Sequence, residues 1–214
     1  MSWLSRSRYR NEILGPHALV TGVHSSPGLT ALCARLDRCK PRAILDLGAS
    51  STENLRFLSR YCDNVAVENL ARSRSAVATK ARSGASRSAP FRLPDVDALS
   101  LPVDSSFDVV LMWDLLHYVE RAQLTRFIAR LAGLCRKDAL VLLLASSTTP
   151  ITPTPMYFRI EGHDRLYYGV SADPPLPAPH FTPGEVEHRM RGFRPLRLYQ
   201  LRNGLQEFLF RYEG

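Results

Sequence analysis

The sequence predicts a single α/β domain with a doubly wound, mostly parallel sheet that ends in an antiparallel β-hairpin. Two observations predict this fold class. Apolar runs without polar alternation, such as 107–113 and 139–144, alternate with segments of helical periodicity, the pattern of buried parallel strands joined by helices. Near the end of the chain, strand-like runs at 193–201 and 205–212 flank Asn203-Gly204, a dipeptide typical of a tight hairpin turn.

The size and composition of the chain fit one domain. It has 214 residues, of which 45% are hydrophobic and 22% charged, as in an ordinary globular protein. Its longest apolar run, 139–145, is too short to span a bilayer, and its first residues do not resemble a secretory signal. The cysteines form no CxxC pair, so we expect no metal site and a reducing, cytoplasmic environment.

The first segment, 1–40, is expected to form a helical cap over the mouth of the domain. Pro27 suits a first helical turn and Pro41 closes the segment. Apolar residues recur there at intervals of three and four, as on one face of a helix: Leu29, Leu32, Cys33 and Leu36.

The next segment, 41–149, is expected to form the core that binds a ligand. Its expected strands are 43–47, 65–68, 107–113 and 139–144. Helices are expected around 55–61, over 70–83 and over 124–134.

The remaining residues divide into a loop and a final unit. The stretch 150–183 is rich in proline and aromatic residues, so we expect an irregular loop that covers the site as a substrate lid. The unit 184–214 is expected to hold a short helix at 185–191 and the terminal hairpin.

Acidic residues stand at or near the expected strand ends. Asp46 and Glu68 end the first two strands of the core, and Asp97 precedes the third. Ligands of open parallel sheets bind beyond the carboxyl ends of the strands, where the strand order reverses. Carboxylates there suit a ligand with hydroxyl and amino groups and repel a bare phosphate, which favours an adenosyl amino acid over a dinucleotide.

Three stretches in the same order resemble the class I S-adenosylmethionine-dependent methyltransferase family. They are ILDLGASSTENL at 44–55, DALSLPVDSSFDVVLMWDLLHYV at 97–119 and HFTPGEVEHRMRGF at 180–193. The resemblance covers roughly residues 40–212 and implies a Rossmann-like fold, S-adenosylmethionine as the cofactor and methyl transfer as the activity.

The resemblance also implies the roles of individual residues. Glu68 would hold the ribose hydroxyls, and Asp97 would contact the adenine amino group, with the backbone of Ala98 at the ring edge. The whole implied cofactor set is Asp46, Gly48, Ala49, Ser50, Glu68, Asn69, Asp97 and Ala98. The implied catalytic pair is Asp114, beside the sulfonium or amino end of the cofactor, and His117, near the substrate. His117 has a second interpretation, which we favour, as an orienting or packing residue on the next helix.

The first motif departs from the family pattern of three alternate glycines. Gly48 is kept, but Ser50 and Thr52 occupy the other two places. Glycine allows a close approach of the backbone to a ligand, whereas a side chain with a hydroxyl occupies that space. The hydroxyls either bond to the amino acid end of the cofactor or narrow the pocket. The second outcome describes a non-catalytic methyltransferase-like protein that serves as a scaffold or regulatory partner of another protein.

The net charge of +8 also has two interpretations. It reflects either a genome that favours arginine or a surface that attracts anions such as RNA. Because the arginines are spread along the chain, we favour the first. The leading hypothesis is therefore methyl transfer to a small-molecule acceptor, with RNA modification and the scaffold role as alternatives.

Overall fold

A computed structural model gives the fold of the protein. It describes residues 10–14, 17–49, 51–70, 101, 105–146, 151–171, 174, 181–202 and 204–214. The elements are β1 (Arg10–Leu14), β2 (His17–Ser25), α1 (Pro27–Cys39), β3 (Ile44–Asp46), α2 (Thr52–Leu58), β4 (Val65–Val67), β5 (Phe107–Trp113), η3 (Leu115–Tyr118), α4 (Leu124–Gly133), β6 (Cys135–Ser146), β7 (Tyr157–Ile160), β8 (Arg165–Ser171), α5 (Pro183–Arg189), β9 (Phe193–Gln200) and β10 (Leu205–Tyr212).

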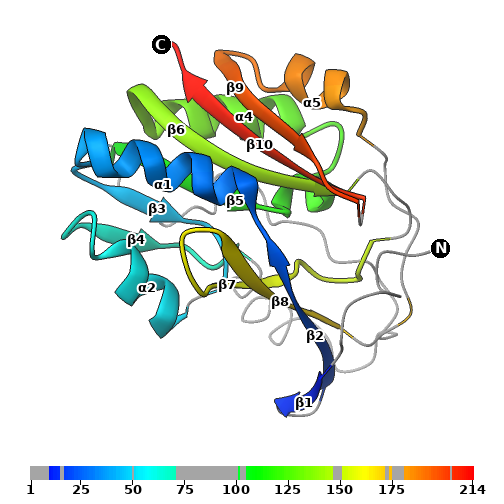
Figure 1. The fold of residues 1–214 in the computed structure, drawn as a ribbon. Helices are drawn as coiled ribbons and strands as arrows, with labels where there is room; N and C mark the ends of the chain where they lie inside the picture. The colour runs from blue at the N-terminus through cyan, green and yellow to red at the C-terminus, as the bar shows by residue number, and fades with distance from the viewer. Residues whose placement is uncertain are drawn as a thin grey trace.

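The central sheet has the strand order β4-β3-β5-β6-β10-β9 (Figure 1). Strand β3 pairs in parallel with β4 and β5, and β5 pairs in parallel with β6. Strand β10 is antiparallel to both β6 and β9. This arrangement confirms the predicted fold class, a mostly parallel sheet closed by an antiparallel hairpin.

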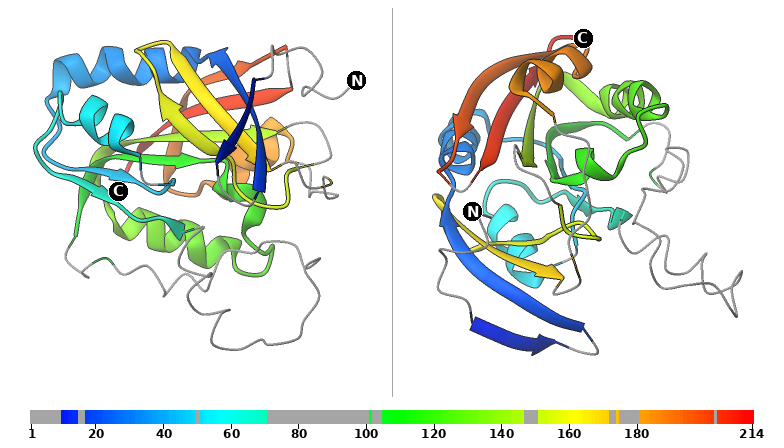
Figure 2. Two further views of the ribbon diagram at one scale, coloured as in Figure 1. Left: turned by 90° about the horizontal axis from the view of Figure 1, so that it is seen from below. Right: turned by 90° about the vertical axis from the view of Figure 1, so that its right-hand side faces the viewer.

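Helices cover both faces of the central sheet, as Figure 2 shows. The face that carries α4 and α5 buries one apolar cluster, which includes Phe127, Val186 and Phe208. The face that carries α1 and α2 buries a second cluster, which includes Leu32 and Phe57. Residues on both sides of β5 and β6 are buried, which explains why these strands show no polar alternation.

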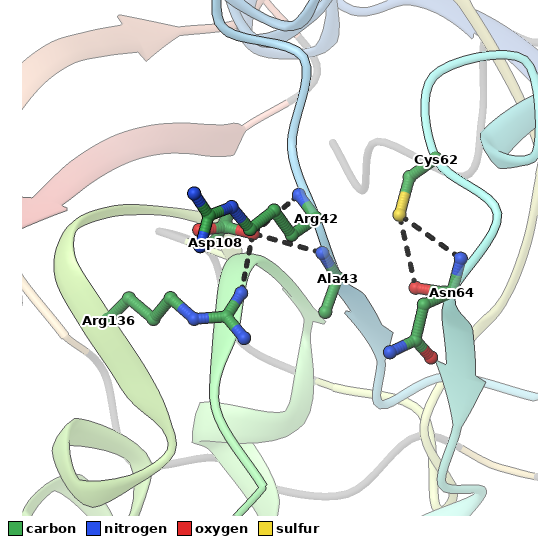
Figure 3. A network of polar contacts seen from close by, with 6 residues as sticks. All are labelled: Arg42, Ala43, Cys62, Asn64, Asp108 and Arg136. Atoms are coloured by element: carbon green, nitrogen blue, oxygen red, sulfur yellow. Dashed lines mark hydrogen bonds and ion pairs between the residues drawn. The ribbon is translucent and has the colours of Figure 1, made fainter.

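The amino ends of the central strands are joined by one carboxylate (Figure 3). Oδ2 of Asp108 accepts hydrogen bonds from the backbone N–H groups of Arg42 at 2.6 Å and Ala43 at 2.9 Å. It also accepts from Nη1 of Arg136 at 2.8 Å. Asp108 therefore holds the entries of β3, β5 and β6 together, at the edge opposite the carboxyl ends of these strands.

A second sheet, with the order β1-β2-β8-β7, corrects two of the sequence-based expectations. The expected helix over 1–40 is wrong for residues 10–14 and 17–25, which are strands; among the described residues of this segment, the helix covers Pro27–Cys39. It begins there because Ser26 Oγ accepts from the N–H of Leu29. Before that point neighbouring side chains alternate, with Val23 46% exposed and His24 directed inward at 10%, as in a strand.

The expected irregular loop over 150–183 is also wrong. It contains β7 and β8, which pair with each other as a hairpin, and β8 pairs with β2. The inward residues Phe158, Leu166 and Tyr168 are buried in the same cluster as α1 and α2. The aromatic content of this stretch therefore supplies the inner face of a sheet. A role of this sheet as a substrate lid stays a prediction.

One buried glutamate links the second sheet to the central one. Glu207 on β10 is 0% exposed, and its Oε2 accepts from the backbone N–H of Gly28, in the first turn of α1, at 2.6 Å. Its Oε1 lies 3.2 Å from Nε2 of His24 on β2. A Cβ at Gly28 would stand 2.8 Å from that Oε2, so glycine is required here by space.

Other predicted elements agree with the structure. The expected strands at 43–47 and 65–68 appear as the shorter β3 and β4, and the helices expected at 124–134 and 185–191 correspond to α4 and α5. The predicted helix over 70–83 and Asn203 of the hairpin turn lie outside the described residues, apart from Leu70. Within the described part of the chain, no helix is long and apolar enough to cross a membrane.

Candidate functional site

The candidate site lies at the carboxyl ends of β3, β4 and β5. After β3 the chain continues to β4 on one side, and β5 pairs with β3 on the other, so the strand order reverses here. Asp46 ends β3, Glu68 follows β4 and Asp114 follows β5. The backbone N–H of Glu68 donates to the carbonyl of Asp46 at 2.9 Å, which keeps these two residues side by side.

The carboxylate of Asp46 is used to build the loop. It is 1% exposed, and its Oδ1 accepts from the N–H of Gly48 at 2.9 Å and from Nε1 of Trp113 at 2.6 Å. Nδ2 of Asn54 lies 3.4 Å from its Oδ2. Burial raises the pKa of Asp46, and these donors oppose that rise. The geometry gives Asp46 a positioning role, and its predicted contact with the cofactor stays a prediction.

Trp113 determines the shape of the site at the end of β5. It is 1% exposed and has a φ of 51°, a left-handed conformation that is rare for a large aromatic residue. The indole ring stacks on Phe158 of β7, with centroids 5.1 Å apart and planes 11° apart. A Cβ at Gly48 would stand 2.5 Å from the indole Nε1, so the retained glycine makes room for Trp113.

Asp114 places a buried carboxyl group beside this loop. It is 2% exposed, and its Oδ2 accepts from the N–H of Met156 at 3.0 Å. Its Oδ1 is buried and makes no hydrogen bond of good geometry. Burial raises the pKa of Asp114 to about 7, opposed by the Met156 N–H and by the nearby Tyr118 hydroxyl.

Asp114 and Gly48 line one small hollow of about 50 Å³. Its other lining residues come from the loop after β3, from β5 and η3, and from the segment that enters β7: Leu47, Ala49, Trp113, Leu115, Pro155, Met156 and Tyr157. The structure therefore brings the predicted residues Gly48, Ala49 and Asp114 together in one place.

His117 is held by the backbone of the neighbouring strand. Its Nε2 accepts from the N–H of Ser146 at 2.7 Å, and its ring lies 5.8 Å from that of Phe181. An Nε2 that accepts a hydrogen bond carries no proton and is not available to take one. Since His117 is also 6% exposed, the geometry favours the packing interpretation over the catalytic one.

Some of the remaining predicted cofactor residues lie in the part of the chain that the structure describes, and others do not. Ala49 and Asn69 lie half-buried, after β3 and β4 respectively. Thr52 is exposed as the first residue of α2. Ser50, Asp97 and Ala98 lie outside the described residues, so their predicted cofactor contacts stay predictions.

Sequence reasoning missed Asn54 and the Trp113–Phe158 pair. Asn54 appears in the first motif as an ordinary helix residue, and nothing local indicates that its side chain is 1% exposed. For Trp113 there is a signal: a large aromatic residue directly before Asp114, at the end of a buried strand.

Comparison with known protein families finds a match within the central part of the chain. Residues 44–138 match the family model described as a methyltransferase domain, the same stretch that runs from β3 to the start of β6. This stretch, which is less than half of the chain, is therefore similar to a methyltransferase domain.

Two solved structures share the fold of this chain. An S-adenosylmethionine-dependent methyltransferase from Clostridium acetobutylicum is 9% identical, with a TM-score of 0.53, over 87% of this chain and 90% of that one. The 1,6-didemethyltoxoflavin-N1-methyltransferase of Burkholderia thailandensis is 18% identical, with a TM-score of 0.50, over 88% and 77%. At these identities the likeness establishes the fold. A search of curated proteins finds no significant match.

The described residues of the methyltransferase domain fit the family's cofactor, S-adenosylmethionine, in one specific respect. The cofactor carries positive charge on its sulfonium and ammonium groups. The buried Oδ1 of Asp114, which lacks a hydrogen bond of good geometry, offers a carboxyl oxygen that such a group would satisfy.

Proposed function

We propose that this protein transfers the methyl group of S-adenosylmethionine to a small-molecule acceptor in the cytoplasm. One observation carries the proposal. Three acidic residues, Asp46, Glu68 and Asp114, follow three adjacent parallel strands where the strand order reverses, inside a methyltransferase domain. Acids in this position suit a ligand with hydroxyl and ammonium groups.

Each acid has a distinct role in the proposal. Asp46 is buried and shapes the loop through Gly48 and Trp113. Glu68 is half-buried next to it, where its carboxylate would accept hydrogen bonds from the ribose hydroxyls. Asp114 would receive the positively charged end of the cofactor on Oδ1 while Oδ2 stays bonded to Met156.

The proposed reaction does not require a general acid or base from the protein. When bound, S-adenosylmethionine supplies a methyl group that is already activated for in-line displacement. The protein's contribution is then to hold the two reactants close and aligned and to exclude water. The buried Trp113, Phe158 and Met156 supply an apolar wall for this purpose. His117 is assigned no proton transfer because its Nε2 is already bonded to Ser146.

The small-molecule acceptor is proposed by analogy of fold. The Burkholderia enzyme is named for its acceptor, and it was solved with 1,6-didemethyltoxoflavin and S-adenosylhomocysteine bound. Among the described residues of the present chain, the hollow beside Asp114 has a volume of about 50 Å³.

Calorimetric titration of the purified protein with S-adenosylmethionine and S-adenosylhomocysteine tests the proposal. Saturation at about 100 times the dissociation constant should raise the free energy of unfolding by about 2.7 kcal/mol, which a thermal melt would also register. Absence of binding at millimolar ligand would contradict the proposal. It would favour the non-catalytic alternative, in which the loop with Ser50 and Thr52 narrows the pocket, and would direct the search to protein partners.

A further inference from the structure

We propose that Asn54 is a positioning residue that joins the cofactor loop to the second sheet, so that both are ordered as one unit. The proposal rests on the proposed function, since it assumes that the cofactor binds at the loop after β3. It assigns a role in methyl transfer to a residue on α2 that lies outside the predicted set of cofactor contacts.

The carboxamide of Asn54 bonds to both sides of this junction. Its Nδ2 donates to the carbonyl of Phe158 at 3.0 Å and lies 3.4 Å from Oδ2 of Asp46. Its Oδ1 accepts from the N–H of Ile160 at 2.7 Å. The side chain thus satisfies one carbonyl and one N–H of β7, as a neighbouring strand would.

These hydrogen bonds lie at the edge of the second sheet, where β7 is the last strand in the order. Among the described strands, β7 stands at one edge of the second sheet, and none of them pairs with its outward backbone groups. Asn54 meets that edge from α2, at the third helical position after the cap Ser51. Because the side chain is 1% exposed, water does not readily replace these bonds if they break.

Trp113 of the central sheet makes a second connection between the loop after β3 and β7. Trp113 donates to Asp46 and stacks on Phe158, so Asp46 and β7 are linked twice, once through Asn54 and once through Trp113. A ligand that orders the loop from Asp46 to Ser51 would therefore also order β7 and the entry segment at Met156, which borders the hollow beside Asp114.

Hydrogen exchange of the whole chain, with and without S-adenosylhomocysteine, tests this coupling. In the native protein, the ligand should slow exchange at Tyr157–Ile160 as well as in the loop. In Asn54→Ala, we expect binding to persist at lower affinity, with no transfer of protection to β7. Equal protection of β7 in both proteins, or protection of β7 in neither despite binding, would overturn the proposal.

Two further variants separate coupling from folding. Ser51→Ala removes the cap of α2, which accepts from the N–H of Asn54, and leaves the bonds to β7 in place. It should speed exchange within α2 and leave the transfer of protection to β7 intact. Asn54→Asp keeps the shape and the acceptor for Ile160 but replaces the donor with a group that repels Asp46. Asn54→Asp should also lose the transfer of ligand-induced protection to β7. This variant therefore tests the coupling if Asn54→Ala fails to fold.

A ligand-free comparison distinguishes failure of this proposal from failure of the proposed function. Without ligand, Asn54→Ala should speed exchange at Ile160 and, indirectly, at Leu47–Ser51, by at least about tenfold, as expected for loss of a buried hydrogen bond. If the native protein binds no cofactor but both regions respond, the proposed function fails and the coupling holds. If only Ile160 responds, the coupling fails whatever the ligand result.

Discussion

Trp113 donates its indole N–H to Oδ1 of Asp46 across 2.6 Å, and both side chains are buried at the point where the strand order of the central sheet reverses. The bond joins the ends of β3 and β5. It also explains two neighbouring features, since the indole occupies the space that a Cβ at Gly48 would need and presents its face to Phe158. The loop after β3 is thus built around an aromatic residue.

Trp113→Phe should lower the free energy of unfolding by about 1–3 kcal/mol, because a buried carboxylate loses a donor while most of the stacking on Phe158 is retained. Urea denaturation monitored by far-ultraviolet circular dichroism would measure the loss. In the Asp46→Asn background the same substitution should cost less, since the amide needs fewer donors. Equal costs in both backgrounds would show that the bond contributes nothing.

Gly48→Ala should destabilise the protein and weaken cofactor binding together. The new Cβ would meet Nε1 and Cδ1 of Trp113 at 2.5 and 2.6 Å, so the indole must move away from Asp46. We expect a loss of about 1–3 kcal/mol, typical of overpacking. The matched control is Gly133→Ala in α4, where a Cβ meets nothing within 4 Å; it should instead be stabilising by about 0.5–1 kcal/mol. Similar effects at the two positions would contradict the spatial argument.

Asp114→Asn should change how stability depends on pH. Burial raises the pKa of Asp114 to about 7, so the unfolded chain releases this proton at lower pH than the folded protein does. The free energy of unfolding of the native protein therefore falls as pH rises from about 4 to about 7, by up to about 4 kcal/mol relative to Asp114→Asn. Above about pH 8 the difference should be constant. Denaturation at several pH values would measure it, and parallel curves across this window would show that the carboxyl is not perturbed.

Glu68→Ala should weaken binding of S-adenosylhomocysteine by more than about 1 kcal/mol, as for a lost hydrogen bond to a charged group. Calorimetry would give the dissociation constants. Asp63→Ala is the control, because Asp63 is an exposed acid before β4, at the opposite edge of the sheet. Unchanged affinity in Glu68→Ala would remove this residue from the proposed cofactor site.

The positions of Asp46 and Glu68 at strand ends follow from short apolar runs that end in an acid, and the structure places both residues there. The sequence did not predict that the Asp46 carboxylate would be enclosed by Gly48, Trp113 and Asn54. Burial of a carboxylate depends on the residues that pack over it, and the local sequence pattern does not identify them.

His117 illustrates the same limit. The sequence allows either a catalytic or a packing role for His117, because a histidine after a strand end suits both. The hydrogen bond from the N–H of Ser146, a residue of another strand, favours packing. The local sequence pattern around His117 does not predict this hydrogen-bond donor.

The parallel strands β3, β5 and β6, the helix α4 and the terminal hairpin are predictable from the sequence, because each follows from periodicity or turn chemistry within a few residues. The strand at residues 17–25 depends instead on contacts between distant segments, since β2 pairs with β8, where His24 lies opposite Leu166. The same is true of the hydrogen bond between Asn54 and Ile160, which are 106 residues apart. Pairing between distant segments depends on the apolar surface that both bury against the same core. The sequence of one strand does not identify the strand with which it pairs.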